Sequence, residues 1–240
     1  MSGRVLGLLG GMAWPSSAEA YAQLNRRVAA ARGGVASAEL LLRSVDFAKV
    51  EALQRDGDWD GAGVLLADAA RGLVAGGAGA IALLTNTMHR VAPAIEAAVD
   101  VPLLHVADAT AAACHAAGAR TVGLLGTRFT MEQAGVRDRL VAHGLEVVVP
   151  SEQGRGRVHA RIYDELVLGE VTDGARRDLA AAAAEVVALG AEAVVAGCTE
   201  IELALGADDV AVAYVPTTAT LMDACTAWLL EGTRTRAPGA

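Results

Sequence analysis

Short apolar runs alternate with longer amphipathic stretches along nearly the whole chain. The runs are rich in Val, Leu and Ala and end at Gly, Pro, Asp or Asn, which is typical of strands buried on both faces of a sheet. The stretches between them repeat their apolar positions with a helical period. This alternation predicts an α/β fold in which helices cover parallel sheets.

The pattern can be divided into individual elements. The predicted strands are 5–9, 39–42, 80–84, 103–106, 121–125, 146–149, 193–196 and 210–215. The predicted helices are 16–31, 59–75, 88–98, 107–117, 130–143, 161–168, 173–189 and 217–230. Parallel strands in one sheet need right-handed crossovers, so the prediction is a pair of doubly wound units.

Two motifs occur twice at nearly equal offsets. The segment 7–11, GLLGG, is echoed by 123–127, GLLGT, and the segment 79–87 is echoed by 190–200. A repeat of this size predicts two similar domains related by pseudo-twofold symmetry, with an active site in the cleft between them. The predicted boundaries are 1–107 and 108–216, with a C-terminal helix over 217–232 that packs back on the first domain.

Composition excludes several classes of protein. The formal charge of −8 is spread without a Lys/Arg cluster, which argues against nucleic acid as a partner. No uncharged apolar run approaches the roughly 18 residues of a membrane span, and the N-terminal run is too short for a signal peptide. We therefore expect a cytoplasmic protein. Lys49 is the only lysine, and its surroundings look like a solvated helix face, so a pyridoxal-phosphate Schiff base is not expected.

Glycines follow the first predicted strand. The arrangement Gly7-x-x-Gly10-Gly11 differs from the G-x-G-x-x-G fingerprint of dinucleotide-binding proteins. Glycine permits a tight turn there, and the exposed amides of Gly10, Gly11 and Met12 could receive an anion such as a substrate carboxylate.

Polar side chains follow two other predicted strands. Thr85, Asn86 and Thr87 come directly after the strand 80–84, where a single one would suffice to cap the next helix. Excess capping is one interpretation, and a pocket for a small zwitterion is the other. In open α/β sheets ligands bind beyond the carboxyl ends of the strands, which favours the pocket.

Cys198 follows the strand 193–196 at a predicted helix start, beside Thr199 and Glu200. A thiol at a helix N-terminus has its pKa lowered below about 8.5, so Cys198 is expected to supply a base, with an inert buried cysteine as the alternative. Cys114 and Cys225 lie in Ala-rich helical patterns and are expected to be buried.

The histidines carry less information. His89, His105 and His159 lie near predicted strand or helix ends and are expected to line the cleft, whereas His115 and His143 are expected on helix surfaces. No His/Cys/Asp group has the spacing of metal ligands, so no metal is expected.

Three segments carry a specific resemblance. Gly7–Met12, Thr85–His89 and Gly197–Ile201 are similar to signature segments of the cofactor-independent aspartate/glutamate racemase family, and the similarity runs over nearly the whole chain. The resemblance implies an isomerase that needs no cofactor and that uses a cysteine on each side of the substrate Cα as base and acid in turn.

The second cysteine of that pair matches Cys198, but Thr85 stands where most members carry the first. The chain therefore resembles a subgroup specific for L-aspartate and L-glutamate, or of broader specificity. The resemblance implies that Thr85 and Cys198 are catalytic. It also implies a set of substrate contacts: Met12, Gln54, Asn86, Thr87, Thr199 and Glu200. Aspartate-specific relatives carry a lysine before the glycine that matches Gly169, where this chain has residues 166–168, LVL.

A threonine hydroxyl cannot ionise appreciably near neutral pH, so Thr85 can only position or relay a proton. We expect initial turnover from the L form to exceed that from the D form, at an equilibrium constant of unity. The expected partner is a small amino-acid substrate, with neither nucleic acid nor membrane, and a homodimer is left open. The alternatives are a single-cysteine decarboxylase, a maleate-type isomerase of the same superfamily, or a non-catalytic amino-acid-binding protein.

Overall fold

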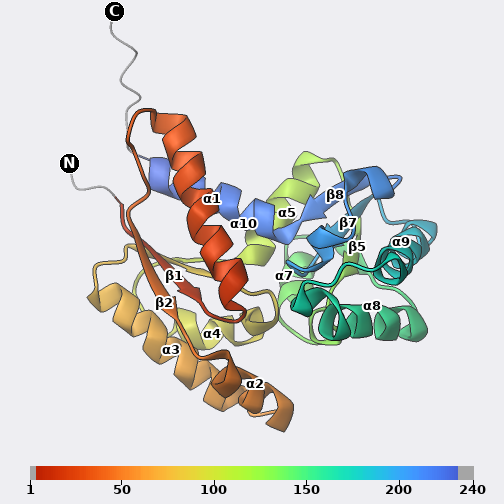
Figure 1. The fold of residues 1–240 in the computed structure, drawn as a ribbon, viewed down its shortest axis with the longest axis horizontal. Helices are drawn as coiled ribbons and strands as arrows, with labels where there is room; N and C mark the ends of the chain where they lie inside the picture. The colour runs from red at the N-terminus through yellow and green to blue at the C-terminus, as the bar shows by residue number, and fades with distance from the viewer. Residues whose placement is uncertain (1–3, 232–240) are drawn as a thin grey trace, which may run out of the picture. The chain divides into compact units, whose positions relative to one another are not determined.

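The computed structural model describes residues 4–231 and confirms the predicted fold class (Figure 1). It contains two parallel four-stranded sheets, each with flanking helices. The chain divides into two compact units: unit 1 comprises residues 4–84, 93–104 and 222–231 of the described part, and unit 2 comprises residues 85–92 and 105–221. Residues 1–3 and residue 232, which fall in the predicted ranges, lie outside the described residues.

The sheet of unit 1 has the strand order β2-β1-β3-β4, with all neighbours parallel. Its elements, with the short helices that follow β3, are β1 (Leu6–Gly10), α1 (Trp14–Arg32), β2 (Leu40–Ser44), α2 (Phe47–Asp56), α3 (Trp59–Ala75), β3 (Ala80–Leu83), the 3-10 helix η1 (Thr87–Val91, in unit 2), α4 (Ala92–Glu96) and β4 (Leu103–Leu104). Strands β1 and β3 are wholly buried because α1 and α3 cover opposite faces of the sheet (Figure 1).

The sheet of unit 2 has the equivalent order, β6-β5-β7-β8. Its elements are α5 (Val106–Ala116), β5 (Thr121–Leu125), α6 (Arg128–Glu132), α7 (Val136–Ala142), β6 (Glu146–Val148), α8 (Glu152–Asp164), η2 (Leu166–Leu168), α9 (Asp173–Ala188), β7 (Ala193–Ala196), η3 (Ile201–Leu203), η4 (Ala207–Asp209), β8 (Ala213–Pro216) and the first residues of α10 (Thr217–Leu230), which belongs to unit 1 from Met222 onward. Helix α9 lies so close to β5 that a Cβ on Gly123 would come within 2.3 Å of Val186. The motif glycine of the second repeat is therefore a packing residue.

Three predicted helices differ from those observed. The helix predicted over 130–143 is divided into α6 and α7 at Gly135, whose φ of +124° takes it out of the helical region. The helix predicted over 161–168 begins earlier, as α8, where Ser151 accepts a hydrogen bond from the amide of Gly154. Two glycines in its first turns weaken the helical pattern in the sequence. The helix predicted over 88–98 is the 3-10 helix η1 followed by the single turn α4.

The last predicted strand and helix also test the pattern. The strand predicted over 210–215 is β8, Ala213–Pro216, because the preceding residues form the 3-10 helix η4. The helix predicted over 217–230 is α10 with the same bounds. None of the helices within residues 4–231 is both long and apolar enough to cross a membrane.

Candidate active site

Six of the eight predicted site residues lie in unit 2. Thr85 and Asn86 lie between β3 and η1, and Thr87 begins η1; these three residues are called the first polar turn. Cys198, Thr199 and Glu200 form the second polar turn, between β7 and η3. Met12 and Gln54 lie in unit 1, in the turn after β1 and in α2 respectively. Both turns of unit 2 follow the carboxyl end of a buried strand, which is where ligands bind in parallel sheets.

The side chain of Asn86 is held by a hydrogen bond to another side chain and does not cap the helix that follows it. It occupies the N-cap position of η1, yet its side chain bonds none of the described amides of that helix. Its Nδ2 donates instead to Oγ1 of Thr217 over 2.9 Å, and that hydroxyl donates to the carbonyl of Ala196 over 2.8 Å. Ala196 ends β7, two residues before Cys198. This chain of hydrogen bonds connects the two polar turns of unit 2 and counts against the interpretation of excess capping.

The other end of the Asn86 amide is unpaired. Its Oδ1 is buried and has no hydrogen-bond partner among the described residues. A buried acceptor without a donor costs roughly 1–3 kcal/mol. A ligand that donates an N–H group to this oxygen removes that cost, which makes its free energy of binding more favourable.

The thiol of Cys198 contacts a carboxylate. Its Sγ donates to Oε2 of Glu200 over 2.9 Å, and the hydroxyl of Thr199 donates to the same oxygen over 2.6 Å. Burial raises the pKa of the Cys198 thiol well above its ordinary value, and the negative charge of Glu200 raises it further.

The expectation of a lowered thiol pKa was therefore wrong. The following helix, η3, spans only Ile201–Leu203 and offers little N-terminal field, while a carboxylate lies in contact with the sulfur. The other two cysteines match their prediction, because Cys114 and Cys225 are fully buried, and burial raises their pKa to about 11 and about 12 respectively.

The expectation that His89 and His105 line a cleft was also wrong, because their exposed fractions are only 1% and 3%. The rings meet edge to face with centroids 4.3 Å apart. His89 Nε2 accepts a hydrogen bond from the amide of Val106 over 3.2 Å, so its proton lies on Nδ1, which donates to the carbonyl of Thr85 over 2.6 Å. His89 therefore holds the backbone of the first polar turn through its hydrogen bond to the Thr85 carbonyl.

The remaining histidines behave differently from this pair. His115 and His143 are exposed, as expected, and the ring of His143 also contacts Oδ1 of Asp108 at 2.7 Å. His159 is half-buried against Tyr163, with ring centroids 4.7 Å apart. Within residues 4–231 no group of His, Cys, Asp and Glu side chains could hold a metal ion.

The first glycine turn does not offer all three of the free amides that its sequence suggested. The amide of Gly11 donates to Oγ of Ser17 over 2.8 Å, so the protein itself satisfies one of the three. A Cβ on Gly10 would come within 2.4 Å of that hydroxyl, and one on Gly11 within 2.3 Å of the Val45 carbonyl. These glycines are explained by the close approach of α1 and β2 to the turn.

Two threonines that were not among the predicted site residues contact the first polar turn. Thr217, which is fully buried, bonds Asn86, and the hydroxyl oxygens of Thr127 and Thr87 lie 3.5 Å apart. Thr127 also caps α6 by accepting from the amide of Thr130. Threonine at a helix start is an ordinary capping residue, so only the three-dimensional contacts distinguish these two.

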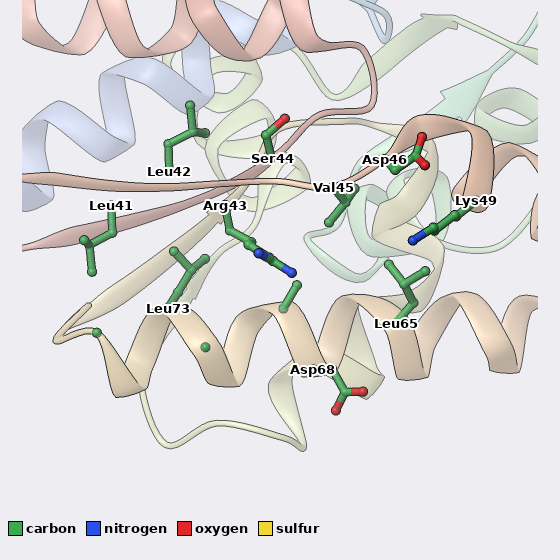
Figure 2. Close-up of a pocket in the computed structure, with 13 residues that line it drawn as sticks. Leu41, Leu42, Arg43, Ser44, Val45, Asp46, Lys49, Leu65, Asp68 and Leu73 are labelled. Atoms are coloured by element: carbon green, nitrogen blue, oxygen red, sulfur yellow. The ribbon is translucent and has the colours of Figure 1, made fainter.

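Unit 1 contains a pocket of about 840 Å³ between β2, α2 and α3 (Figure 2). Leu41 and Arg43 extend from β2 toward α3, whereas Leu42 points to the other side of the strand (Figure 2). Lys49 lines this pocket from α2 and is exposed, as its sequence pattern predicted. None of the predicted site residues is among the described residues that line it.

Comparison with known proteins gives the family. The model of the Asp/Glu/Hydantoin racemase family matches residues 9–225, nearly the whole chain. The chain belongs to the Asp/Glu/hydantoin racemase family. Both polar turns of unit 2 lie inside the matched region, as does the turn that contains Met12. Membership in this racemase family supports an isomerase activity.

Solved structures agree with membership in the racemase family. A putative Asp/Glu racemase from Yersinia pestis is 44% identical, with a TM-score of 0.91 over 95% of this chain and 100% of that chain. An aspartate racemase homologue from Pyrococcus horikoshii is 28% identical, with a TM-score of 0.82 over 95% of this chain and 100% of that chain. Glutamate racemase from Francisella tularensis, at 14% identity and a TM-score of 0.64 over 98% and 86% of the two chains, shows the shared fold.

Proposed function

We propose that the protein is a racemase that interconverts L- and D-aspartate or L- and D-glutamate without pyridoxal phosphate, with Cys198 as the base at Cα. The observation that carries the proposal is the contact of the Cys198 thiol with the Glu200 carboxylate, 2.9 Å apart at the carboxyl end of β7, in a chain of the racemase family. A thiol can take a proton from Cα only after it loses its own, and the neighbouring carboxylate oxygen is placed to accept it.

The charge of the substrate explains how a thiol with a raised pKa can act. In the unliganded protein burial and Glu200 both favour the neutral thiol. An amino-acid ammonium group near Glu200 compensates the carboxylate charge and so removes part of the cost of forming a thiolate beside it. The base would then form when substrate is bound.

Thr85 would serve the opposite face of Cα. Its hydroxyl cannot act as a base near neutral pH, but it can orient a water molecule that delivers a proton to the planar carbanion. The proton taken from Cα restores the Cys198 thiol. The proton that Glu200 received from that thiol passes to solvent, where it neutralises the hydroxide left when water protonates the carbanion. One Cα–H bond breaks and one forms, so no oxidant or reductant is needed.

The remaining predicted residues would orient the substrate. Asn86 Oδ1 is a buried acceptor that suits an ammonium group, and the hydroxyl of Thr87 suits a carboxylate. The Thr199 hydroxyl donates its proton to Glu200, so Thr199 would contact the substrate as an acceptor. Met12 and Gln54 are proposed contacts from unit 1. Aspartate-specific relatives carry a lysine in the segment before the glycine that matches Gly169, whereas here Leu166–Leu168 supply no cation for a substrate side-chain carboxylate.

The test is deuterium incorporation at Cα of L-aspartate and L-glutamate in D2O, with the enantiomers separated by chiral chromatography. Cys198→Ser and Cys198→Ala should reduce the incorporation about a hundredfold or more. Cys114→Ala, which alters a buried cysteine of α5, should leave it near the wild-type rate. Undiminished incorporation in both Cys198 variants would reject Cys198 as the base.

The same assay separates the alternatives. Release of carbon dioxide would identify a decarboxylase, and conversion of maleate to fumarate would identify the isomerase. Binding of amino acid without deuterium incorporation would identify a non-catalytic binding protein. A racemase should also retain its activity after dialysis against a chelator, with no gain on addition of pyridoxal phosphate.

A further inference from the structure

Thr217 determines which end of the Asn86 amide the protein holds. A threonine hydroxyl has one proton, and the Ala196 carbonyl, which can only accept, lies 2.8 Å from Oγ1. The hydroxyl proton is used there, so toward Asn86 the oxygen of Thr217 can only accept. The group that faces it over 2.9 Å must therefore be the amide nitrogen.

The orientation of the amide follows from this chain of donors and acceptors. In the flipped amide, Oδ1 of Asn86 would face the lone pairs of Thr217 Oγ1, and two acceptors would meet without a proton between them. Thr217 is fully buried, so solvent cannot take its place. The flipped state would lose one hydrogen bond and leave the amide nitrogen to find another acceptor.

The fixed amide selects the chemistry of its ligand. With the nitrogen held, Oδ1 remains as a buried acceptor that has no protein donor among the described residues. An ammonium group supplies N–H donors to such an oxygen, whereas a carboxylate supplies none. Asn86 held in this way discriminates between the two charged groups of a zwitterion.

We propose that Thr217 is a positioning residue for the substrate's ammonium group: it holds the Asn86 amide with Nδ2 bound to the protein and Oδ1 left for a ligand donor. This inference rests on the proposed function for the identity of the ligand, but the hydrogen bond itself can be tested without turnover.

The first experiment observes the amide directly. The chain contains only two asparagines, Asn25 and Asn86, so selective ¹⁵N-asparagine labelling gives two side-chain amide signals in an NMR spectrum. Asn86→Ala assigns them, and the Asn25 amide, which donates to the Tyr21 carbonyl, is an internal reference. One Asn86 amide proton should exchange slowly with solvent in the wild type and in Thr217→Ser, and about tenfold or more faster in Thr217→Val. Equal protection in Thr217→Val would overturn the proposal.

The second experiment uses deuterium incorporation into L-aspartate. Thr217→Val should lower kcat/KM about tenfold, mainly through KM, and Thr217→Ser should restore it. Thr226→Val is the matched control, because Thr226 also lies in α10 and donates to a backbone carbonyl, that of Met222, at 2.7 Å. It should leave kcat/KM unchanged.

A double-mutant comparison separates positioning from a general structural role. If Thr217 acts through Asn86, Thr217→Val should change kcat/KM little further in an Asn86→Ala background. An equal loss in both backgrounds would overturn the inference. Absence of deuterium incorporation in the wild type would reject the proposed function instead, and the amide-exchange result would then decide the role of Thr217 by itself.

Discussion

The sulfur of Cys198 lies 2.9 Å from Oε2 of Glu200, and burial together with this contact raises the pKa of the thiol. Glu200 raises the thiol pKa in two ways: its charge opposes a thiolate, and its oxygen accepts the thiol proton. The same carboxylate that suppresses ionisation without substrate would assist it once an ammonium group is bound. Glu200 should therefore slow the alkylation of the Cys198 thiol in the absence of substrate but speed the racemisation of bound substrate.

The first prediction follows from these opposite effects. Glu200→Gln removes the charge, so the Cys198 pKa should fall and alkylation of the thiol by iodoacetamide near neutral pH should become faster, while racemisation becomes slower. The buried Cys114 and Cys225 should contribute little to the alkylation, because their pKa values are raised. The measurement is the pH profile of alkylation, located at Cys198 by mass spectrometry.

Glu202→Gln is the matched control for that variant. Glu202 is the weakest of the groups that raise the Cys198 pKa, so its replacement should shift the alkylation profile less than Glu200→Gln does. Equal profiles for the wild type and Glu200→Gln would show that the carboxylate does not control the thiol.

A second prediction concerns the turn after β1. Gly11 has φ +100°, and an added Cβ would come within 2.3 Å of the Val45 carbonyl, whereas Gly33 has φ +74° with open space around it. Both Ala variants adopt an unfavourable positive-φ backbone conformation that costs about 1–3 kcal/mol, but only Gly11→Ala adds a backbone clash. Gly11→Ala should lower Tm clearly more than Gly33→Ala, as measured by thermal melting. Similar losses of Tm in the two variants would show that the unfavourable φ accounts for the whole destabilisation and that the backbone clash adds nothing.

The hydrophobic pattern was sufficient to predict β1, β3 and β7, because these strands are buried on both faces and appear in the sequence as continuous apolar runs. It placed both polar turns at strand ends for the same reason. It missed the start of α8, where Gly154 and Gly156 weaken the helical signal that Ser151 caps.

The contacts of the two polar turns were harder to predict than the place of these turns after β3 and β7. The direction of the Cys198 pKa depends on a carboxylate two residues away and on the length of η3, and neither a contact nor a helix end is fixed by local sequence. Thr217 lies far along the chain from Asn86, so their hydrogen bond exists only in the folded protein. Capping statistics describe both residues without indicating that they meet.

A third prediction is that the buried His89 makes stability depend on pH. Burial lowers its pKa from 6.5 to about 4, so between these values the unfolded chain binds a proton that the folded protein does not. Stability should therefore fall as the pH is lowered from about 6.5 to about 4, by about 3 kcal/mol in total from this residue. Thermal melting at a series of pH values measures the fall.

His89→Gln removes the titrating ring, so its Tm should be lower near neutral pH but should change less on acidification. His115→Gln, at an exposed histidine of α5, should keep the pH dependence of the wild type. Burial also lowers the pKa of His105, to about 2, so part of the acid sensitivity should remain in His89→Gln. An unchanged pH dependence in His89→Gln would place the sensitivity elsewhere.

The fourth prediction tests Thr85 as the residue on the second face of Cα. For an equilibrium constant of one, kcat/KM must be equal in the two directions, so the informative quantity is the ratio of kcat from the L form to kcat from the D form. In the wild type this ratio should exceed one, because only Cys198 supplies a base. Thr85→Cys adds a thiol on the other face and should lower the ratio, while Thr85→Ala should reduce kcat more than it changes substrate binding, since it removes the hydroxyl that orients the returning proton.

Thr87→Cys, two residues along the same turn, is the control for adding a thiol at the wrong position and should not lower the ratio. If Thr85→Cys leaves the ratio of the wild type unchanged, Thr85 does not face Cα, and the racemase must take its second proton from another group.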